Sequence, residues 1–164
     1  MLLYNRRRFG LVLTLAALAG CGFTPVYGPG GAGTALLAQL SLDPPQDRNA
    51  YLLQRRVEER LGQATADVWR LSTNVKTENI GLGFTTDGDI TRYNVHGTAD
   101  YTLRRTGRSE VFKQGKIQHF TSYSATGTTV ATLAAKRDAE VRLIIILADQ
   151  IIDHLLVISE DLKQ

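Results

Sequence analysis

The stretch that decides the fold reads Ile90-Thr-Arg-Tyr-Asn-Val-His-Gly-Thr-Ala-Asp-Tyr-Thr-Leu-Arg104. From Tyr93 to Leu103, every odd-numbered residue is apolar or small, and every even-numbered residue is polar or charged. A period of two residues is typical of a strand that has one face against a core and the other in water. The stretch therefore predicts a long strand whose odd-numbered side chains are buried.

Similar strands are predicted on either side of this stretch. Residues 69–78 alternate in the same way, and the glycines between residues 81 and 88 predict a loop or turn before the alternation resumes. Thr106-Gly107-Arg108 predicts a tight hairpin connection, and a less regular strand is expected from Glu110 to Tyr123. Gly115 is expected at a bulge or at a close approach of another side chain. Together these strands predict an antiparallel meander with one wet face.

Helices are predicted before and after the meander. Residues 36–42 indicate a short strand that ends at two prolines, which cannot donate to a ladder. A helix capped by Asp47 or Asn49 is expected to run to about residue 64, and a second helix spans residues 133–156. The predicted fold class is α+β, a two-layer sandwich with two helices on one face of a four-stranded sheet. The expected order is strand-helix-strand-strand-strand-helix.

The last predicted helix is apolar on more than one side. At 100° per residue, Leu143 and Ile146 fall beside polar residues such as Arg142 and Gln150. Two interpretations remain open from the sequence. Either the helix packs on its own sheet and also contacts a partner through Leu143 and Ile146, or these are scattered surface residues that soluble proteins tolerate.

The first twenty residues have the layout of a signal peptide. Three arginines at residues 6–8 precede an apolar run at residues 9–18, about half the length that crosses a membrane. The run ends in Leu18-Ala19-Gly20-Cys21, which resembles the lipobox of bacterial lipoproteins. That resemblance implies cleavage after Gly20 and lipidation of Cys21, the only cysteine of the chain. The alternative is an ordinary secretory signal with a chance cysteine near its cleavage site.

This pattern divides the chain into three parts. We expect a cleaved lipoprotein signal peptide at residues 1–20, a flexible lipidated tether at residues 21–34, and a single α+β domain at residues 35–164. The tether is rich in glycine and proline. Two or three acyl chains on Cys21 give lasting membrane attachment, whereas one chain binds only marginally.

The basic balance of the chain does not indicate a nucleic-acid partner. The sequence has 19 Lys and Arg against 16 Asp and Glu, and a pI near 9.2. The three excess arginines all lie in residues 1–20, which contain no acidic residue, so the mature chain is formally neutral. The excess positive charge of the full chain therefore belongs to the predicted signal peptide. It does not indicate a nucleic-acid-binding surface.

The sequence contains no recognisable catalytic constellation. The histidines, His96, His119 and His154, are far apart and have no spacing that would place metal ligands on one helical face. No Gly-x-Ser-x-Gly elbow occurs, and lipidation of Cys21 would leave no thiol for catalysis. We therefore expect no enzyme, no cofactor and no metal site.

Basic residues gather on the polar face of the predicted sheet. Arg70, Lys76, Arg92 and Arg104 share the side opposite the apolar residues, and Arg105, Arg108, Lys113 and Lys116 cluster around the following hairpin. Such a group can bind phosphates, since Arg forms bidentate hydrogen bonds and Lys acts as a point charge. The alternative is a solvated face on which acids are interspersed, as is usual for the exposed side of a sheet.

Several segments resemble a known family. They are Cys21-Gly-Phe-Thr-Pro-Val-Tyr-Gly, residues 87–103, residues 132–140 and Leu147-Ala-Asp-Gln-Ile. These segments are similar to the LPS-assembly lipoprotein family (LptE, rare lipoprotein B) in its alphaproteobacterial form. The resemblance extends over essentially the whole chain, and the predicted order of elements agrees with it.

The resemblance implies a non-enzymatic role in outer-membrane biogenesis in Gram-negative bacteria. Family members are lipoproteins, anchored here by acyl chains such as palmitate on Cys21, whose domain faces the periplasm and the lumen of an outer-membrane β-barrel. They plug this barrel, help it to assemble, and bind lipopolysaccharide for transport to the cell surface. On this basis Arg70, Lys76, Arg92 and Arg104 are candidates for lipopolysaccharide binding. The alternative is a periplasmic lipid-binding carrier or envelope lipoprotein without a barrel partner.

Overall fold

The structure is a computed structural model that describes residue 28, residues 32–159 and residues 161–163. Its elements follow each other in the order η1 (Ala32–Ala35), β1 (Leu40–Leu42), α2 (Arg48–Leu61), β2 (Trp69–Phe84), β3 (Ile90–Arg105), β4 (Val111–Ser124), α3 (Thr129–Val157) and η2 (Asp161–Lys163). The short 3-10 helix η1 begins inside the segment that we expected to be a flexible tether. The predicted signal peptide and Cys21 lie outside the described residues.

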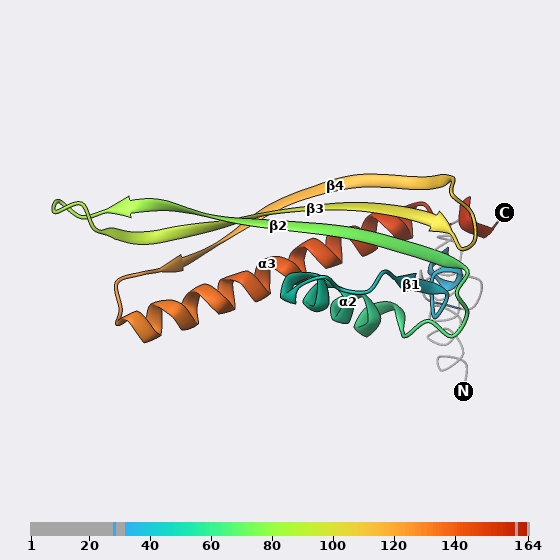
Figure 1. The fold of residues 1–164 in the computed structure, drawn as a ribbon, viewed down its shortest axis with the longest axis horizontal. Coiled ribbons are helices and arrows are strands. Elements are labelled where there is room, and N and C mark those ends of the chain that lie inside the picture. Colours follow the sequence, from blue (N-terminus) through green and yellow to red (C-terminus); the bar gives the residue numbers. More distant parts are fainter. Residues whose placement is uncertain (1–27, 29–31, 160, 164) are drawn as a thin grey trace, which may run out of the picture.

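The fold is the predicted α+β arrangement of two layers. The four strands form one sheet in the order β1-β2-β3-β4, and both α-helices lie on the same side of it (Figure 1). β1 pairs with β2 in parallel, whereas β2, β3 and β4 form an antiparallel meander. The other side of the sheet carries no helix within the described part of the chain (Figure 1). We call this side the open face.

Strand β1 is shorter than the pattern predicts. It pairs over Leu40–Leu42 with Trp69–Leu71 and ends before two prolines, which have no N–H to offer. Leu36, which we expected in this strand, lies in a turn but is fully buried. The chain thus enters the fold beside the first residues of β2.

Strands β2 and β3 form a hairpin that is longer than predicted. Gly81 and Gly83 do not end β2, which runs on to Phe84, so the expected loop at these glycines is wrong. The β2–β3 register shifts at Gly81 and Gly83, and side chains of β3 lie over both glycines. A Cβ at Gly81 would lie 2.8 Å from Ile90 Cδ1, and one at Gly83 would lie 2.5 Å from Thr91 Oγ1. These glycines therefore make room for β3 instead of turning the chain.

Gly115 confirms the expected close approach in β4. A Cβ at this position would lie 2.6 Å from the Tyr101 hydroxyl and 2.7 Å from its ring carbons. The phenol of Tyr101 is buried, and burial raises its pKa. The irregularity in the β3–β4 ladder falls elsewhere, between Leu103 and Arg104.

Helix α2 begins where its cap was predicted. The Asp47 carboxylate accepts a hydrogen bond from the Ala50 amide at 2.7 Å, and the helix ends at Leu61, three residues earlier than expected. Leu53, Val57 and Leu61 are buried on one face. This spacing explains why the helix forms with one side against the core.

Two arginines tie α2 to α3 through one carboxylate. Arg56 donates to Asp149 Oδ1 at 2.9 Å and to Oδ2 at 3.0 Å, and Arg60 donates to Oδ1 at 3.2 Å. Burial opposes ionisation of Asp149, but the hydrogen bonds from Arg56 and Arg60 outweigh it and lower the pKa of this carboxyl. The bridge ties α2 to the C-terminal half of α3.

Helix α3 is apolar on two sides because two elements cover it. It contacts β3 and β4 on one side and α2 on another. Leu143 is fully buried, and its side chain lies over Gly97, where a Cβ would come within 2.8 Å of Leu143 Cδ2. The prediction that Leu143 lies on the outer side of the helix is therefore wrong, whereas Ile146 is only half-buried. None of the helices in the described ranges is both long and apolar enough to cross a membrane.

Gly115→Ala tests the close approach to Tyr101. Replacing glycine by alanine inside a strand normally stabilises by about 0.5–1 kcal/mol. Here the added methyl group meets a rigid buried ring, and we expect the free energy of unfolding to fall by about 1–3 kcal/mol in urea titration. Gln114→Ala, at the exposed neighbouring position, is the control and should stay within about 0.5 kcal/mol of the parent. A stabilised Gly115→Ala protein would contradict the packing.

Asp149→Asn tests the bridge between the helices. The substitution removes the carboxylate that Arg56 and Arg60 share, and we expect it to lower the free energy of unfolding at pH 7 by about 1–3 kcal/mol. Because the folded-state pKa of Asp149 is lowered, its contribution is complete above the unfolded-state pKa of about 3.9 and is lost as pH falls through the folded-state value. The difference between variant and parent should therefore shrink below about pH 4.

Asp153→Asn provides the matched control for this experiment. Asp153 lies 3.5 Å from Arg60, but 63% of its side chain is exposed. We expect this variant to cost less than about 1 kcal/mol. Equal losses for the two variants, or a difference for Asp149→Asn that is constant down to pH 2, would contradict the role of the bridge.

Candidate functional site

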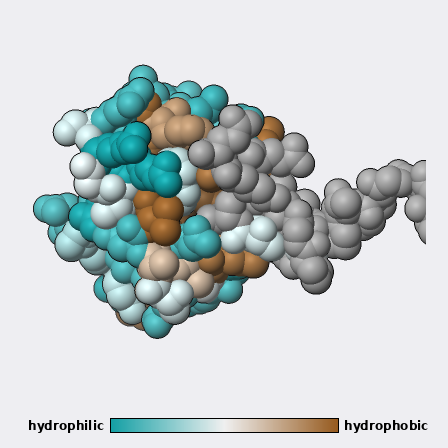
Figure 2. Space-filling model, turned by 90° about the vertical axis from the view of Figure 1, so that its right-hand side faces the viewer, coloured by the Kyte–Doolittle hydropathy of each residue, from teal (hydrophilic) through white to brown (hydrophobic). Residues whose placement is uncertain are grey.

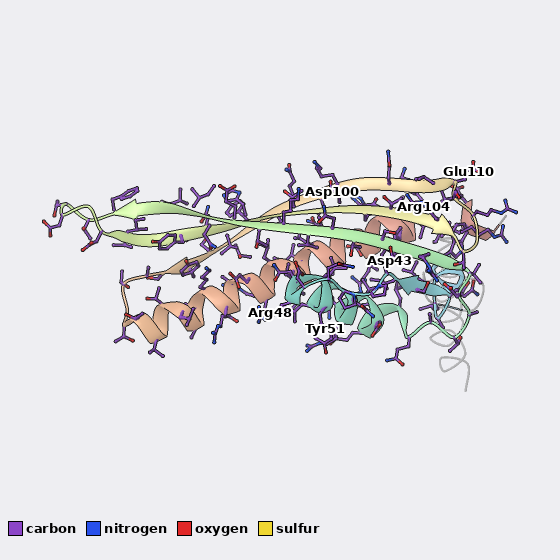
Figure 3. All side chains as sticks on the ribbon, in the orientation of Figure 1. Asp43, Arg48, Tyr51, Asp100, Arg104 and Glu110 are labelled. Atoms are coloured by element: carbon purple, nitrogen blue, oxygen red, sulfur yellow. The ribbon has the colours of Figure 1, made fainter. Side chains whose placement is uncertain are left out.

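Four arginines gather where β2 begins and the β3–β4 hairpin turns. Arg70 and Arg104 are direct partners across the β2–β3 pair. With Arg105 and Arg108 they line a hollow of about 310 Å³. We call these four residues the arginine corner. Figure 3 shows Arg104 at the end of the sheet where Asp43 and Glu110 also lie.

The register of the hairpins brings these residues together. β3 ends at Arg105, and the Arg108 amide donates to the Arg105 carbonyl at 3.0 Å to close the turn. Gly107 has φ of 77°, a left-handed conformation that glycine adopts without cost. The tight turn predicted at residues 106–108 is thus confirmed. It holds Arg108 next to the strand that carries Arg104.

The four predicted cations do not meet at one place. Arg70 and Arg104 lie together, but Lys76 is opposite Thr98, six residues along β2, at a distance of about 20 Å. Arg92 is twelve residues from Arg104 along β3, a distance of about 40 Å. The structure therefore brings together Arg70 and Arg104, and beside them lie Arg105 and Arg108 of the basic cluster expected around the hairpin.

The arginines differ in their acidic partners. Arg70 donates to Asp67 at 2.6 Å, and the same carboxylate accepts from Ser41 and, at 3.0 Å, from Thr106. The hydrogen bond from Ser41 is the largest cause of a lowered pKa at Asp67. Within the described ranges, Arg104 and Arg108 have no ion pair with a carboxylate. Their guanidinium groups are available to an anion.

A groove with both apolar and charged walls lies against the arginine corner, on the helix-facing side of the sheet. It measures about 480 Å³ and includes Trp69, Phe112 and Leu162 among its walls. The Phe112 ring meets the Trp69 ring edge-on, with 5.1 Å between the ring centroids. The Arg105 guanidinium carbon lies 6.0 Å from the Trp69 ring centroid, within reach of a cation–π contact. We call this feature the aromatic groove.

The hollow and the groove share two residues. Arg105 and Arg108 line both of them, so the β3–β4 turn separates a polar depression from one that also has aromatic and aliphatic walls. Figure 2 looks onto this end of the molecule and shows hydrophobic residues directly beside hydrophilic ones. Such an arrangement suits an amphiphile that carries a phosphate next to hydrocarbon.

The aromatic groove was not predicted from the sequence. Trp69 was assigned to the core by its odd-numbered position, and it is indeed only 5% exposed. Phe112 and Leu162 come from β4 and η2, far away in the chain. The one available signal was the predicted hairpin at residues 106–108, which returns β4 alongside β3 and so brings Phe112 near the start of β2.

The histidines do not form a metal site in the described part of the chain. His96 stacks on Phe120, with 5.5 Å between ring centroids, on the open face of the sheet. His119 lies opposite Gly97 and thus points to the other face. The described residues contain no group of three His, Cys, Asp or Glu that could hold a metal ion.

A comparison with protein-family models gives a match over most of the chain. Residues 37–155 match the model of LptE, described as lipopolysaccharide-assembly. The chain belongs to the LptE lipopolysaccharide-assembly family. The match covers β1 through almost all of α3, so it includes the arginine corner of this LptE-family chain. A sequence search of curated proteins gives no match.

Solved structures share this fold at low identity. A chain from Caulobacter crescentus CB15 described as a lipoprotein has a TM-score of 0.65 at 18% identity, covering 77% of this chain and 93% of that chain. Rare lipoprotein B from Shewanella oneidensis has a TM-score of 0.58 at 18% identity, covering 77% and 98%. A minor lipoprotein from Acinetobacter baumannii has a TM-score of 0.54 at 17% identity, covering 74% and 93%. At these identities the likeness shows the fold alone.

Asp67→Asn tests whether the arginine corner is an anion site. The substitution frees Arg70 from its carboxylate partner while keeping a side chain of the same size. We expect inorganic pyrophosphate to bind about two- to fivefold more tightly in isothermal titration, because an exposed ion pair is worth about 0.2–1 kcal/mol. Asp100→Asn, which frees Lys116 elsewhere on the open face, is the control and should leave the affinity unchanged. Weaker binding by Asp67→Asn would contradict the site.

Proposed function

We propose that this LptE-family chain is the lipoprotein component of an outer-membrane lipopolysaccharide translocon. In this role it plugs a β-barrel partner, helps it to assemble, and binds lipopolysaccharide for delivery to the cell surface. The family match over residues 37–155 is the observation that carries the proposal. The mechanism is one of binding and positioning, without a catalytic step.

The arginine corner is the part of the surface best suited to lipid A phosphates. A phosphate accepts two parallel hydrogen bonds from one guanidinium, and four such groups lie around one hollow. Arg104 and Arg108 have no acidic partner in the described ranges, so they can reach an anion without breaking an ion pair. Lys76 and Arg92 lie too far along the sheet to touch the same phosphate, and we assign them a secondary part in binding.

The shape of the domain supports a plug. The long β2–β3 hairpin and α3 give an elongated body (Figure 1), and the even-numbered residues that β3 presents on the open face from Asn94 to Arg104 are polar. The inner wall of a β-barrel with a polar lumen could pack against such a face. Polar strand residues can contact a polar wall without burying apolar surface. Ile146, half-buried on α3, remains a proposed partner contact. Leu143 cannot serve this role because it is buried in the core.

The proposed location follows from the predicted lipobox. Cleavage after Gly20 and acylation of Cys21 would tether the domain to the outer membrane on its periplasmic side. Gly22 follows the cysteine, where an aspartate would usually signal retention in the inner membrane of bacterial lipoproteins. The tether and the barrel together would hold the domain at the site of delivery.

Co-purification tests the barrel partner. The full chain with a C-terminal tag is extracted from outer membranes in mild detergent and analysed by size-exclusion chromatography and mass spectrometry. We expect one β-barrel membrane protein in equal amount. Cys21→Ser is the control for anchoring and should reduce recovery from the membrane fraction. A chain that elutes alone as a monomer would favour a periplasmic lipid-binding carrier instead.

Paired charge reversals test the lipopolysaccharide site. The double variant Arg70→Glu/Arg104→Glu and the double variant Lys76→Glu/Arg92→Glu change the net charge equally but act at different places. We expect the first to weaken lipopolysaccharide binding at least tenfold, because it reverses two charges at one hollow, and the second to weaken it less than threefold. Circular dichroism of each variant checks that it remains folded. Equal losses would indicate diffuse electrostatic attraction and contradict the site.

A further inference from the structure

Apolar side chains are exposed at the end of the molecule where β1 lies. Val111 is 40% and Phe112 43% exposed, and both line the aromatic groove. The Phe112 ring contacts Trp69, and Arg105 lies over the Trp69 ring. Aromatic and arginine side chains have an apolar body and a polar tip, which suits the boundary between hydrocarbon and water.

The rim of this groove carries charges of both signs. Arg105 and Arg108 lie there together with Glu110 and Asp161. None of these four side chains forms an ion pair with another in the described part of the chain. Guanidinium groups pair with phosphate, and carboxylates pair with an ammonium group. The rim therefore matches a zwitterionic headgroup better than a purely anionic one.

The path of the chain brings the same end toward the membrane. The first described element, η1, starts at Ala32 and leads directly into β1 (Figure 1). Eleven residues, 21–31, separate η1 from the predicted lipid on Cys21 and span at most about 40 Å. The β2–β3 turn lies at the opposite end of the long axis (Figure 1), about 50 Å away along the sixteen residues of β2.

We propose that the β1 end of the domain docks on a phospholipid surface. Phe112 and Val111 enter the headgroup layer, Arg105 and Arg108 bind lipid phosphates, and Glu110 and Asp161 face the ammonium groups. The lipid anchor then works with a second contact that sets the orientation of the domain. The long axis stands away from the membrane, with the β2–β3 turn distal. The proposal shares the Cys21 anchor and two residues of the arginine corner, Arg105 and Arg108, with the proposed function.

Trp69 is the single tryptophan of the chain and lines the groove, so it reports docking directly. The test uses the unlipidated chain of residues 21–164 with Cys21→Ser, which retains every described core side chain, from Leu36 to Leu162. Vesicles of phosphatidylethanolamine and phosphatidylcholine carry brominated acyl chains, which quench tryptophan at short range. We expect quenching of Trp69 that saturates with lipid, and no quenching when the chain is mixed with brominated lipid below its vesicle-forming concentration.

Matched variants show which side chains contact the vesicle surface. Phe112→Ser should lower partitioning into vesicles about tenfold, because it removes a large apolar side chain from the contact. Arg108→Glu should lower it about three- to tenfold. Phe84→Ser, at the opposite end and 65% exposed, is the control and should leave partitioning within twofold. Each variant is normalised to its own fluorescence without lipid.

Several results would overturn the proposal. Absence of quenching in the parent chain would do so, as would a loss of partitioning in Phe84→Ser that equals the loss in Phe112→Ser. Complete displacement by excess inorganic phosphate would assign the arginines to free phosphate and not to a lipid surface. Co-purification with a barrel is measured independently of vesicle binding. A chain that does not dock on vesicles can still be the translocon component, and a chain that does not co-purify with a barrel can still dock on a membrane.

Discussion

The packing of α3 across the odd-numbered face of β3 is the contact on which the rest of the structure depends. Leu143 and Leu147 lie over Gly97, which has no side chain to hold them away from the sheet. This contact fixes which face of the meander is dry, and therefore that the even-numbered residues form the open face. A one-residue slip in β3 would exchange the two faces and bury Asp100 and Arg104.

The same constraint places the basic residues. Once the odd-numbered side chains are buried, Arg70 and Arg104 must share the open face, and the tight turn at Gly107 returns the chain so that Arg105 and Arg108 join them. Trp69, also odd-numbered, remains on the helix-facing side with Phe112. The core register thus places the polar hollow and the aromatic groove back to back at one end of the sheet.

Much of the fold could be predicted because its signals are local. The period of two in residues 93–103 and the cap at Asp47 need no knowledge of distant contacts. Leu143 was misplaced because the helical projection puts it beside Arg142 and Gln150, whereas its side chain packs on β3 over Gly97, which leaves room for it. Gly81 and Gly83 suggested a turn, but they accommodate side chains of β3, which the local sequence does not show. Sharing a face did not put Arg92 near Arg104, because twelve residues of strand separate them.

The central claim is that strand register concentrates phosphate recognition at the β1 end of this LptE-family domain. Arginine side-chain NMR during titration with lipid A measures this most directly, since each Nε–H group reports its own contact. The account predicts that the Nε–H signals of Arg104 and Arg108 shift first and saturate together, while that of Arg92 stays in place. A signal of Arg92 that shifts first, or equal shifts for all arginines, would contradict it.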